Sequence, residues 1–204
     1  DIIRNNSLVF INSEPLLDYP RPTTHRVIDI GGIVTAPKPK PLDEKWSSIF
    51  DLRPHTILVS FGTYVPAHTM PDHYKKAIIS TLSHFENITF ILKYEKPEEN
   101  LTKGTDNIIE SPWLPQVDML NDPRLTAFIT HGGQGSIMEA HHAGVPMLVV
   151  PVTGDQFRNA NLVKRSQAGL ILYKEDMLDE SKFHAAIEEI IGNERRGQNL
   201  LFLF

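Results

Sequence analysis

The chain has 204 residues, no cysteine and a formal net charge of −5, with its basic residues scattered along the whole length. This length suits one globular domain with a flanking piece. The charge gives no reason to expect nucleic-acid binding. The lack of cysteine excludes disulfides, thiolate metal sites and a cysteine nucleophile. No apolar run approaches the length of a membrane span.

The first part of the chain differs in pattern from the rest. Residues 1–36 contain two strand-like runs, at 8–11 and 27–30, and the sequence Lys38-Pro39-Lys40-Pro41 follows. Alternating prolines favour an extended spacer without helix. We therefore predict a boundary here, with a main domain over residues 37–192 and a tail over residues 193–204. Both ends of the chain lie in runs of apolar residues, so we interpret the chain as part of a longer protein.

Beyond this boundary, short apolar runs alternate regularly with amphipathic segments. This alternation predicts a parallel sheet covered by helices on both faces, which is a doubly wound α/β domain. Such domains bind ligands at the carboxyl ends of their strands. The predicted strands lie at 57–61, 88–92, 107–110, 125–130, 145–150 and 169–172, and the predicted helices at 71–82, 135–143 and 155–166, with a last helix capped by Ser181.

The run from Phe128 to Glu139 predicts an anion site. A strand ends there, glycines follow, and a helix begins whose amides and dipole suit a phosphate. Ser136 and His131 can donate to the same oxygens, and Glu139 can accept from ribose hydroxyls. The alternative is a simple tight turn with Glu139 facing solvent. Met138 stands where a dinucleotide fingerprint needs its third glycine, which counts against a nicotinamide enzyme.

Two further loops carry candidate binding residues. In Ser111-Pro112-Trp113-Leu114-Pro115-Gln116, Trp113 could stack on a base while Gln116 bonds its edge; the alternative is that Trp113 belongs to the core. After the strand at 145–150, Asp155 and Gln156 could bond sugar hydroxyls; the alternative is that Asp155 only caps a helix.

A fourth candidate is Gly62-Thr63, which follows the strand at 57–61. All four features come directly after predicted strands. In a parallel sheet these positions meet at one edge, where a single ligand would lie.

Together these motifs resemble those of the UDP-glycosyltransferases, with the animal UDP-glucuronosyltransferase and UDP-glucosyltransferase branch as the best match. The likeness covers nearly the whole chain. It implies a Rossmann-like, doubly wound fold that forms the C-terminal half of a GT-B glycosyltransferase, with residues 1–36 as the end of the N-terminal domain and the interdomain approach. The matching segments are Pro20-Arg21-Pro22, Phe61-Gly62-Thr63, Trp113-Leu114-Pro115-Gln116, His131 to Glu139, Gly144-Val145-Pro146, Pro151 and Asp155-Gln156.

The resemblance assigns roles to ten residues. They are Trp113 and Gln116 for uracil; Thr63, His131, Gly133, Gly135 and Ser136 for the diphosphate; Glu139 for ribose; and Asp155 and Gln156 for the transferred sugar. Gly135 stands where the family often has asparagine, so a side-chain contact to phosphate is lost there. The family's catalytic histidine and its aspartate partner belong to the N-terminal half, and His131 is not that base. We therefore expect no catalytic residue, no cofactor and no metal in this chain.

The implied reaction transfers glucuronic acid or glucose from its UDP derivative to hydroxyls of small lipophilic acceptors, with inversion. The partners would be the UDP-sugar, the acceptor and the N-terminal acceptor domain; oligomerisation stays open, and this chain alone is expected to be inactive. One alternative is a non-catalytic, truncated UDP-binding or regulatory module. Another is a different GT-B enzyme such as a UDP-sugar epimerase, which the Trp113 loop and the Asp155-Gln156 pair disfavour.

The resemblance also implies a cellular setting. The full-length parent would be a membrane glycoprotein of the endoplasmic reticulum, facing the lumen and serving detoxification, while this chain by itself would be soluble. The sequence contains three glycosylation sequons, at Asn5, Asn87 and Asn100, and these give a hint in the same direction.

Overall fold

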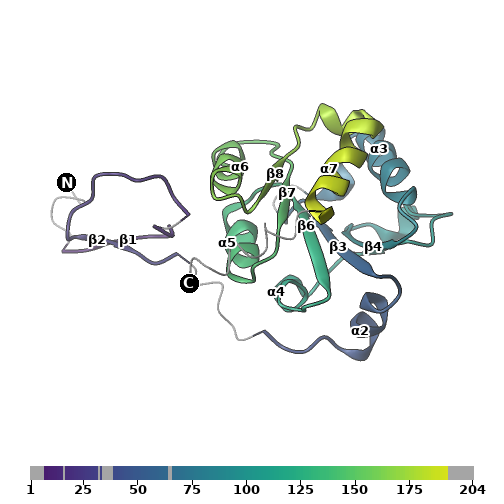
Figure 1. Ribbon diagram of the computed structural model, residues 1–204, viewed down its shortest axis with the longest axis horizontal. Helices are drawn as coiled ribbons and strands as arrows, with labels where there is room; N and C mark the ends of the chain where they lie inside the picture. The colour runs from purple at the N-terminus through teal and green to yellow at the C-terminus, as the bar shows by residue number, and fades with distance from the viewer. Residues whose placement is uncertain (1–6, 16, 32, 34–38, 64–65, 193–204) are drawn as a thin grey trace.

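The computed structural model describes residues 7–15, 17–31, 33, 39–63 and 66–192. Its main body is a parallel sheet in the order β5-β4-β3-β6-β7-β8, with helices on both faces (Figure 1). The doubly wound α/β prediction is therefore confirmed. The strands are β3 (His55–Ser60), β4 (Ile88–Lys93), β5 (Ile108–Ser111), β6 (Leu125–Thr130), β7 (Met147–Val149) and β8 (Gly169–Ile171).

Two apolar clusters, one on each face, hold the helices against the sheet. Alternate strand residues point to opposite faces, so Ile57 belongs to the cluster under α3 and α7, and Leu58 to the cluster under α2, α4, α5 and α6. The helices are α2 (Glu44–Phe50), α3 (Asp72–Ser83), α4 (Gln116–Leu120), α5 (Gln134–His142), α6 (Gln156–Arg165) and α7 (Glu180–Gly192), with short 3-10 turns η1 (Ala67–Thr69), η2 (Pro97–Glu99) and η3 (Asp176–Leu178).

Several predicted boundaries differ from the observed ones by one or more residues, and hydrogen bonds explain two of the differences. The strand predicted to start at Val145 starts at Met147, because the Val145 amide donates to the Ala140 carbonyl (3.0 Å) and so still closes α5. The predicted cap of the last helix, Ser181, lies inside that helix. The capping role falls to Asp179, whose carboxylate accepts from the Lys182 amide at 3.2 Å.

Two short helices were not predicted. In α2, Asp43 accepts from the Trp46 amide at 2.9 Å, and Trp46 and Phe50 are buried. The other, α4, starts immediately after Pro115. Both are too short to show the helical repeat that identifies longer helices from sequence.

The described residues between 7 and 33 form a separate unit, here called the N-terminal module. It contains a two-stranded parallel sheet of β1 (Val9–Ile11) and β2 (Val27–Asp29) and lies beside α5 and α6 (Figure 1). Of the predicted spacer, Lys38 lies outside the described residues, and the Lys40 amide donates to Asp118 of α4 at 2.7 Å. The predicted tail, residues 193–204, also lies outside them.

The topology of the main sheet selects one place for a ligand. Counted from its first strand, the sheet has the order 3-2-1-4-5-6, so the chain reverses direction across the sheet between β3 and β6. In doubly wound sheets the helices on either side of this reversal leave a crevice at the carboxyl ends of the two strands.

Candidate functional site

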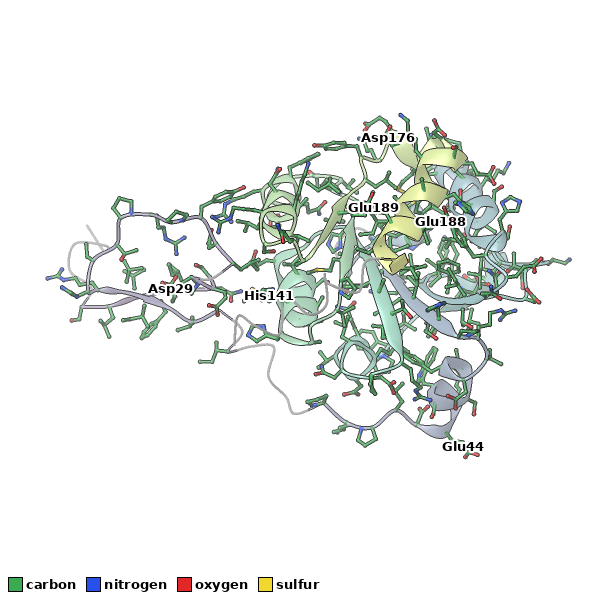
Figure 2. The ribbon with its side chains drawn as sticks, viewed as in Figure 1. Asp29, Glu44, His141, Asp176, Glu188 and Glu189 are labelled. Carbon is green, nitrogen blue, oxygen red and sulfur yellow. The ribbon has the colours of Figure 1, made fainter. Side chains whose placement is uncertain are left out.

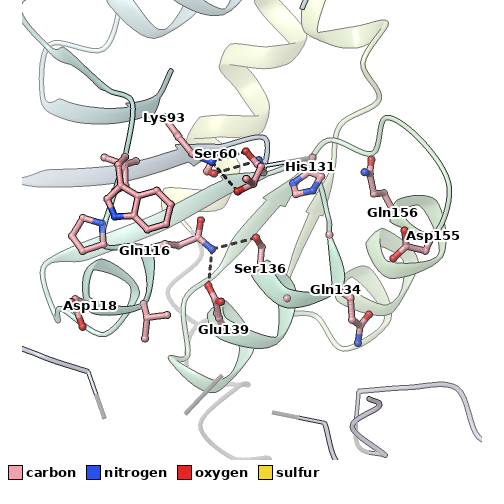
Figure 3. Close-up of a pocket in the computed structure, with 18 of the residues that line it drawn as sticks. Ser60, Lys93, Gln116, Asp118, His131, Gln134, Ser136, Glu139, Asp155 and Gln156 are labelled. Atoms are coloured by element: carbon pink, nitrogen blue, oxygen red, sulfur yellow. Dashed lines mark hydrogen bonds between the residues drawn. The ribbon is translucent and has the colours of Figure 1, made fainter. Parts of the chain in front are cut away.

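A pocket of about 890 Å³ opens at this crevice (Figure 3). All ten residues that were selected from the sequence line it, although they come from four separate segments of the chain. Their convergence follows from the topology, because each segment leaves the carboxyl end of a parallel strand. The ten are Thr63, Trp113, Gln116, His131, Gly133, Gly135, Ser136, Glu139, Asp155 and Gln156.

The turn between β6 and α5 forms the floor of the pocket. Gly132 has φ +89°, a left-handed conformation that glycine adopts without strain, and it lets the chain turn directly into α5. Gly133 is the N-cap residue and offers no side chain to the first amides of the helix. The helix therefore presents its positive end toward the pocket, which suits an anion.

His131 lies between two glycines. A Cβ at Gly62 would come within 2.6 Å of the His131 ring, and a Cβ at Gly133 would come equally close, at 2.6 Å. Burial lowers the pKa of His131; the nearby charge of Asp155 opposes this effect and that of Lys93 adds to it. The pKa lies below its ordinary value, so the imidazole is neutral at pH 7 and can donate one hydrogen bond without carrying charge.

Lys93 is a pocket residue that the sequence analysis missed. Its ammonium is almost buried and donates to the Gly62 carbonyl at 2.8 Å and to the Thr63 hydroxyl at 3.0 Å. The strand predicted at 88–92 extends one residue further, to Lys93. The same rule that selected Thr63 and His131, a polar residue at a strand's carboxyl end, would have found it.

At one end of the pocket, side chains of α4 and α5 bond to each other. The Gln116 amide donates to the Glu139 carboxylate at 2.6 Å and to the Ser136 hydroxyl at 3.2 Å (Figure 3). Trp113 is 72% exposed at the pocket rim, so the core alternative does not hold for it; the buried tryptophan of this chain is Trp46. An exposed indole plane beside a bonded amide and carboxylate can hold a base and a ribose.

At the other end, the first residues of α6 close a loop. Gln156 is 6% exposed, and its carbonyl oxygen accepts from the amides of Val152 (2.8 Å) and Thr153 (2.9 Å). The Asp155 side chain accepts from Asn159 at 2.9 Å and makes no capping bond to the helix amides, so the simple helix-cap alternative does not hold. These carboxylate and amide groups could bond to sugar hydroxyls.

A second, smaller cavity of about 230 Å³ adjoins this end. It shares His131 and Gln156 with the main pocket, and its other walls are mainly apolar. They include Phe61, Ala67, Met70, Tyr74, Val150, Val152 and Met177.

Among residues 7–15, 17–31, 33, 39–63 and 66–192, no group of three histidine or carboxylate side chains could hold a metal ion. In that same part of the chain, no helix has the length and apolar composition needed to cross a bilayer.

The comparisons with known proteins agree on one family. The family model described as UDP-glucoronosyl and UDP-glucosyl transferase matches residues 1–204. The putative UDP-glucuronosyltransferases ugt-55 and ugt-56 of Caenorhabditis elegans are 38% and 36% identical to the chain and cover all of it. The chain spans 40% and 39% of the length of these two relatives.

Solved structures match the fold at lower identity. A UDP-glucosyltransferase from Polygonum tinctorium gives a TM-score of 0.74 at 22% identity, covering 97% of this chain and 49% of that protein. A UDP-glucose:anthocyanidin 3-O-glucosyltransferase in complex with UDP gives 0.75 at 20% identity, with 97% and 48% covered. The fold is that of the C-terminal half of a GT-B glycosyltransferase.

Proposed function

The chain belongs to the UDP-glucoronosyl and UDP-glucosyl transferase family, and we propose that it binds the UDP-sugar donor of an inverting glycosyltransferase. The observation that carries this proposal is the convergence of the ten selected residues in one pocket at the reversal point of the sheet. The solved relative that holds UDP adds support, because it shares the fold.

The donor would lie across the pocket from Trp113 to Asp155. Uracil stacks on the exposed Trp113 ring, and Gln116 and Glu139 exchange their mutual bond for bonds to the base and the ribose. The diphosphate lies over the start of α5, within reach of Ser136, His131, Gly133 and Thr63. Asp155 and the Nε2 group of Gln156 hold the transferred sugar.

In this arrangement the chain's own groups stabilise the departing UDP. Negative charge grows on the phosphate oxygens as the bond to the sugar breaks, and amides at the start of α5 are already aimed at that position. We add Lys93 to the predicted set, because its buried ammonium is a fixed positive charge beside Thr63. We expect the general base to come from the N-terminal half of the longer family members, and this chain alone to be inactive.

The transferred sugar would be glucuronic acid or glucose, and the acceptor a small lipophilic alcohol or phenol. The apolar cavity next to His131 and Gln156 supports the second point, because it adjoins the place where the sugar would meet its acceptor. The asparagines of two sequons, Asn87 and Asn100, are exposed, which is consistent with a glycoprotein of the endoplasmic reticulum lumen.

Calorimetry of the chain with UDP, UDP-glucose and UDP-glucuronic acid, with and without EDTA, tests the proposal. We expect micromolar-to-millimolar binding of UDP that EDTA does not change, and at least tenfold weaker binding by the Glu139→Ala variant. ADP is the matched control, since it carries the same diphosphate on a different base. Equal binding of UDP and ADP, or none to a folded chain, would contradict the assignment.

The alternative is a non-catalytic UDP-binding module, and UDP binding alone does not exclude it. A transfer assay separates the two possibilities. Activity in a protein that joins this chain to an N-terminal half, together with none in the chain alone, supports the transferase. Binding without transfer in either protein supports the module.

A further inference from the structure

The N-terminal module contacts the main domain through the outer face of α6. Leu17 inserts into the apolar cluster of the main domain and is 2% exposed, and the neighbouring Asp18 is 8% exposed. The partners of Asp18 on α6 are 140 or more residues away in the sequence. This contact therefore connects two units that the sequence separates by a proline-containing spacer.

Two arginines of α6 grip this segment. Arg158 bonds to the Asp18 carboxylate, and Arg165 donates to the main-chain carbonyls of Asp18 (2.6 Å) and Leu17 (3.3 Å). Arg158 and Arg165 are seven residues apart, which is two helical turns, so they extend from the same face of α6. Two contacts that are separated along one helix fix the orientation of the module, whereas a single contact would let the module rotate about it.

An aromatic ring fills the space between the two arginines. Tyr19 lies 5.5 Å from the Arg158 guanidinium and 5.0 Å from that of Arg165, measured to the ring centre. Both distances are within the range of cation–π attraction. Tyr19 thus adds a contact between the module and each of the two arginines.

Charge pairing continues into the module itself. Arg21 bonds to the Asp18 carboxylate at 3.1 Å and to Asp29 of β2 at 2.9 Å, and it also reaches the Ser13 hydroxyl at 2.9 Å. Figure 2 labels Asp29 within the module. Burial alone raises the pKa of Asp18, but bonds from the Tyr19 amide and Arg158 outweigh it, and the pKa lies below its ordinary value. Asp18 is therefore charged at neutral pH.

The start of α6 also belongs to the donor pocket. Asn159, next to Arg158 in the sequence, donates to the Gly132 carbonyl at 3.0 Å and to Asp155 at 2.9 Å. One short helix thus touches the phosphate turn, carries Asp155 and Gln156, and holds the N-terminal module. If the module moved on α6, then its position and orientation relative to the donor pocket would change.

We propose that Asp18, Tyr19, Arg158 and Arg165 form an orientation clamp that sets the direction of the N-terminal module relative to the donor pocket. The inference rests on the proposed function, since this module would lead into the half of the enzyme that binds the acceptor. The four are positioning residues: they hold the geometry between the two halves and do not touch the donor. The Arg158 side chain is 46% exposed, so its ion pair with Asp18 adds little to stability and acts mainly by fixing how the module lies on α6.

The absence of cysteine in this chain makes a direct test possible. Spin labels on Phe10→Cys of β1 and Lys76→Cys of α3, both exposed, report the distance between module and main domain by pulsed electron resonance. We expect one narrow distance distribution. In the Arg158→Ala/Arg165→Ala variant it should broaden at least twofold, while UDP affinity by calorimetry changes less than twofold.

Two further variants sharpen the test. Lys164→Ala is the matched control, because it removes an exposed positive charge from the same helix between the two clamp arginines, and the distribution should stay narrow. Asp18→Asn removes only the charge of the carboxylate that Arg158 binds, and it serves if the double variant does not fold. It should also broaden the distance distribution. An unchanged width in both clamp variants would overturn the proposal. A chain that fails to bind UDP would refute the donor role alone, since the distance measurement needs no ligand.

Discussion

At the nucleoside end of the pocket Trp113 is 72% exposed and Gln116 bonds to other side chains, whereas at the sugar end Gln156 is 6% exposed and bonds to the main chain. Side chains that bond to one another can exchange those bonds for a ligand at little cost. A side chain that accepts bonds from two main-chain amides of its own loop holds that loop in place and cannot leave without releasing it. The contrast indicates that the ligand-binding side chains at the nucleoside end are not needed for the fold, whereas at the sugar end the same side chain serves both the fold and the ligand.

The strongest test of this contrast is stability. Gln156→Ala leaves the amides of Val152 and Thr153 without an acceptor, and we expect a loss of about 2 kcal/mol in the free energy of unfolding. Gln116→Ala is the matched control, and we expect it to lose less than about 1 kcal/mol because its partners can turn to water or to ligand. Urea denaturation of both variants gives the comparison. Equal losses would show that both ends are built alike.

Replacement of Trp113 should have the next largest effect, and this effect should be on UDP binding and not on stability. Loss of a stacked aromatic costs about 1–3 kcal/mol per base, so Trp113→Ala should weaken UDP binding tenfold or more while leaving the melting temperature nearly unchanged. Phe157→Ala removes another exposed aromatic, 42% exposed on α6, and should alter neither quantity. Calorimetry and thermal denaturation check both variants. A Trp113→Ala variant with full UDP affinity would remove the stacking role.

Most of the fold and all ten selected pocket residues could be predicted, and for one physical reason. Buried strands of a parallel sheet are continuous apolar runs, so the end of each strand can be located from the sequence. Thr63, His131 and Asp155 lie in different loops, yet the parallel arrangement brings them to one edge. The position of a residue after its strand was therefore enough to place it in the pocket.

The rest depends on contacts that no local pattern contains. Lys93 was missed because its strand was ended one residue too early, and its bond to Thr63 exists only once the neighbouring strand is in place. Gln156 was selected for a sugar, but its bonds to its own loop exist only once that loop has folded. The pairing of Asp18 with Arg158 spans 140 residues and has no sequence signal at all.

His131 lies between the two ends of the pocket. The pH dependence of UDP binding tests whether it contacts the ligand, as Gln116 would, or only serves the structure. Burial lowers its pKa in the free chain, and a bound diphosphate would raise it by placing negative charge beside the ring. The complex then binds more protons than the free chain, so UDP affinity should increase as pH falls from 7.5 to 6, by about fivefold. Calorimetry in buffers of different ionisation enthalpy measures the proton uptake.

His131→Gln is the control for this titration, since UDP itself also gains protons near pH 6. The variant should show only the change that belongs to UDP. Identical pH profiles for the chain and the variant would mean that His131 serves the structure, as Gln156 does, and does not approach the phosphates.

Gly135 offers the smallest change and the only expected gain. It lies in the first turn of α5, and a Cβ there would meet no atom within 4 Å, so the pocket has room for a side chain at this point. Gly135→Asn should donate a hydrogen bond to the diphosphate and strengthen UDP binding about two- to threefold, well below the full value of a bond to a charged group because water already serves that oxygen. Gly135→Ala separates this effect from helix propensity: it should stabilise the fold by about 0.5 kcal/mol and leave UDP affinity unchanged. If alanine and asparagine raise the affinity equally, then the flexibility of the turn limits binding. In that case the nucleoside end would depend on folding just as the sugar end does.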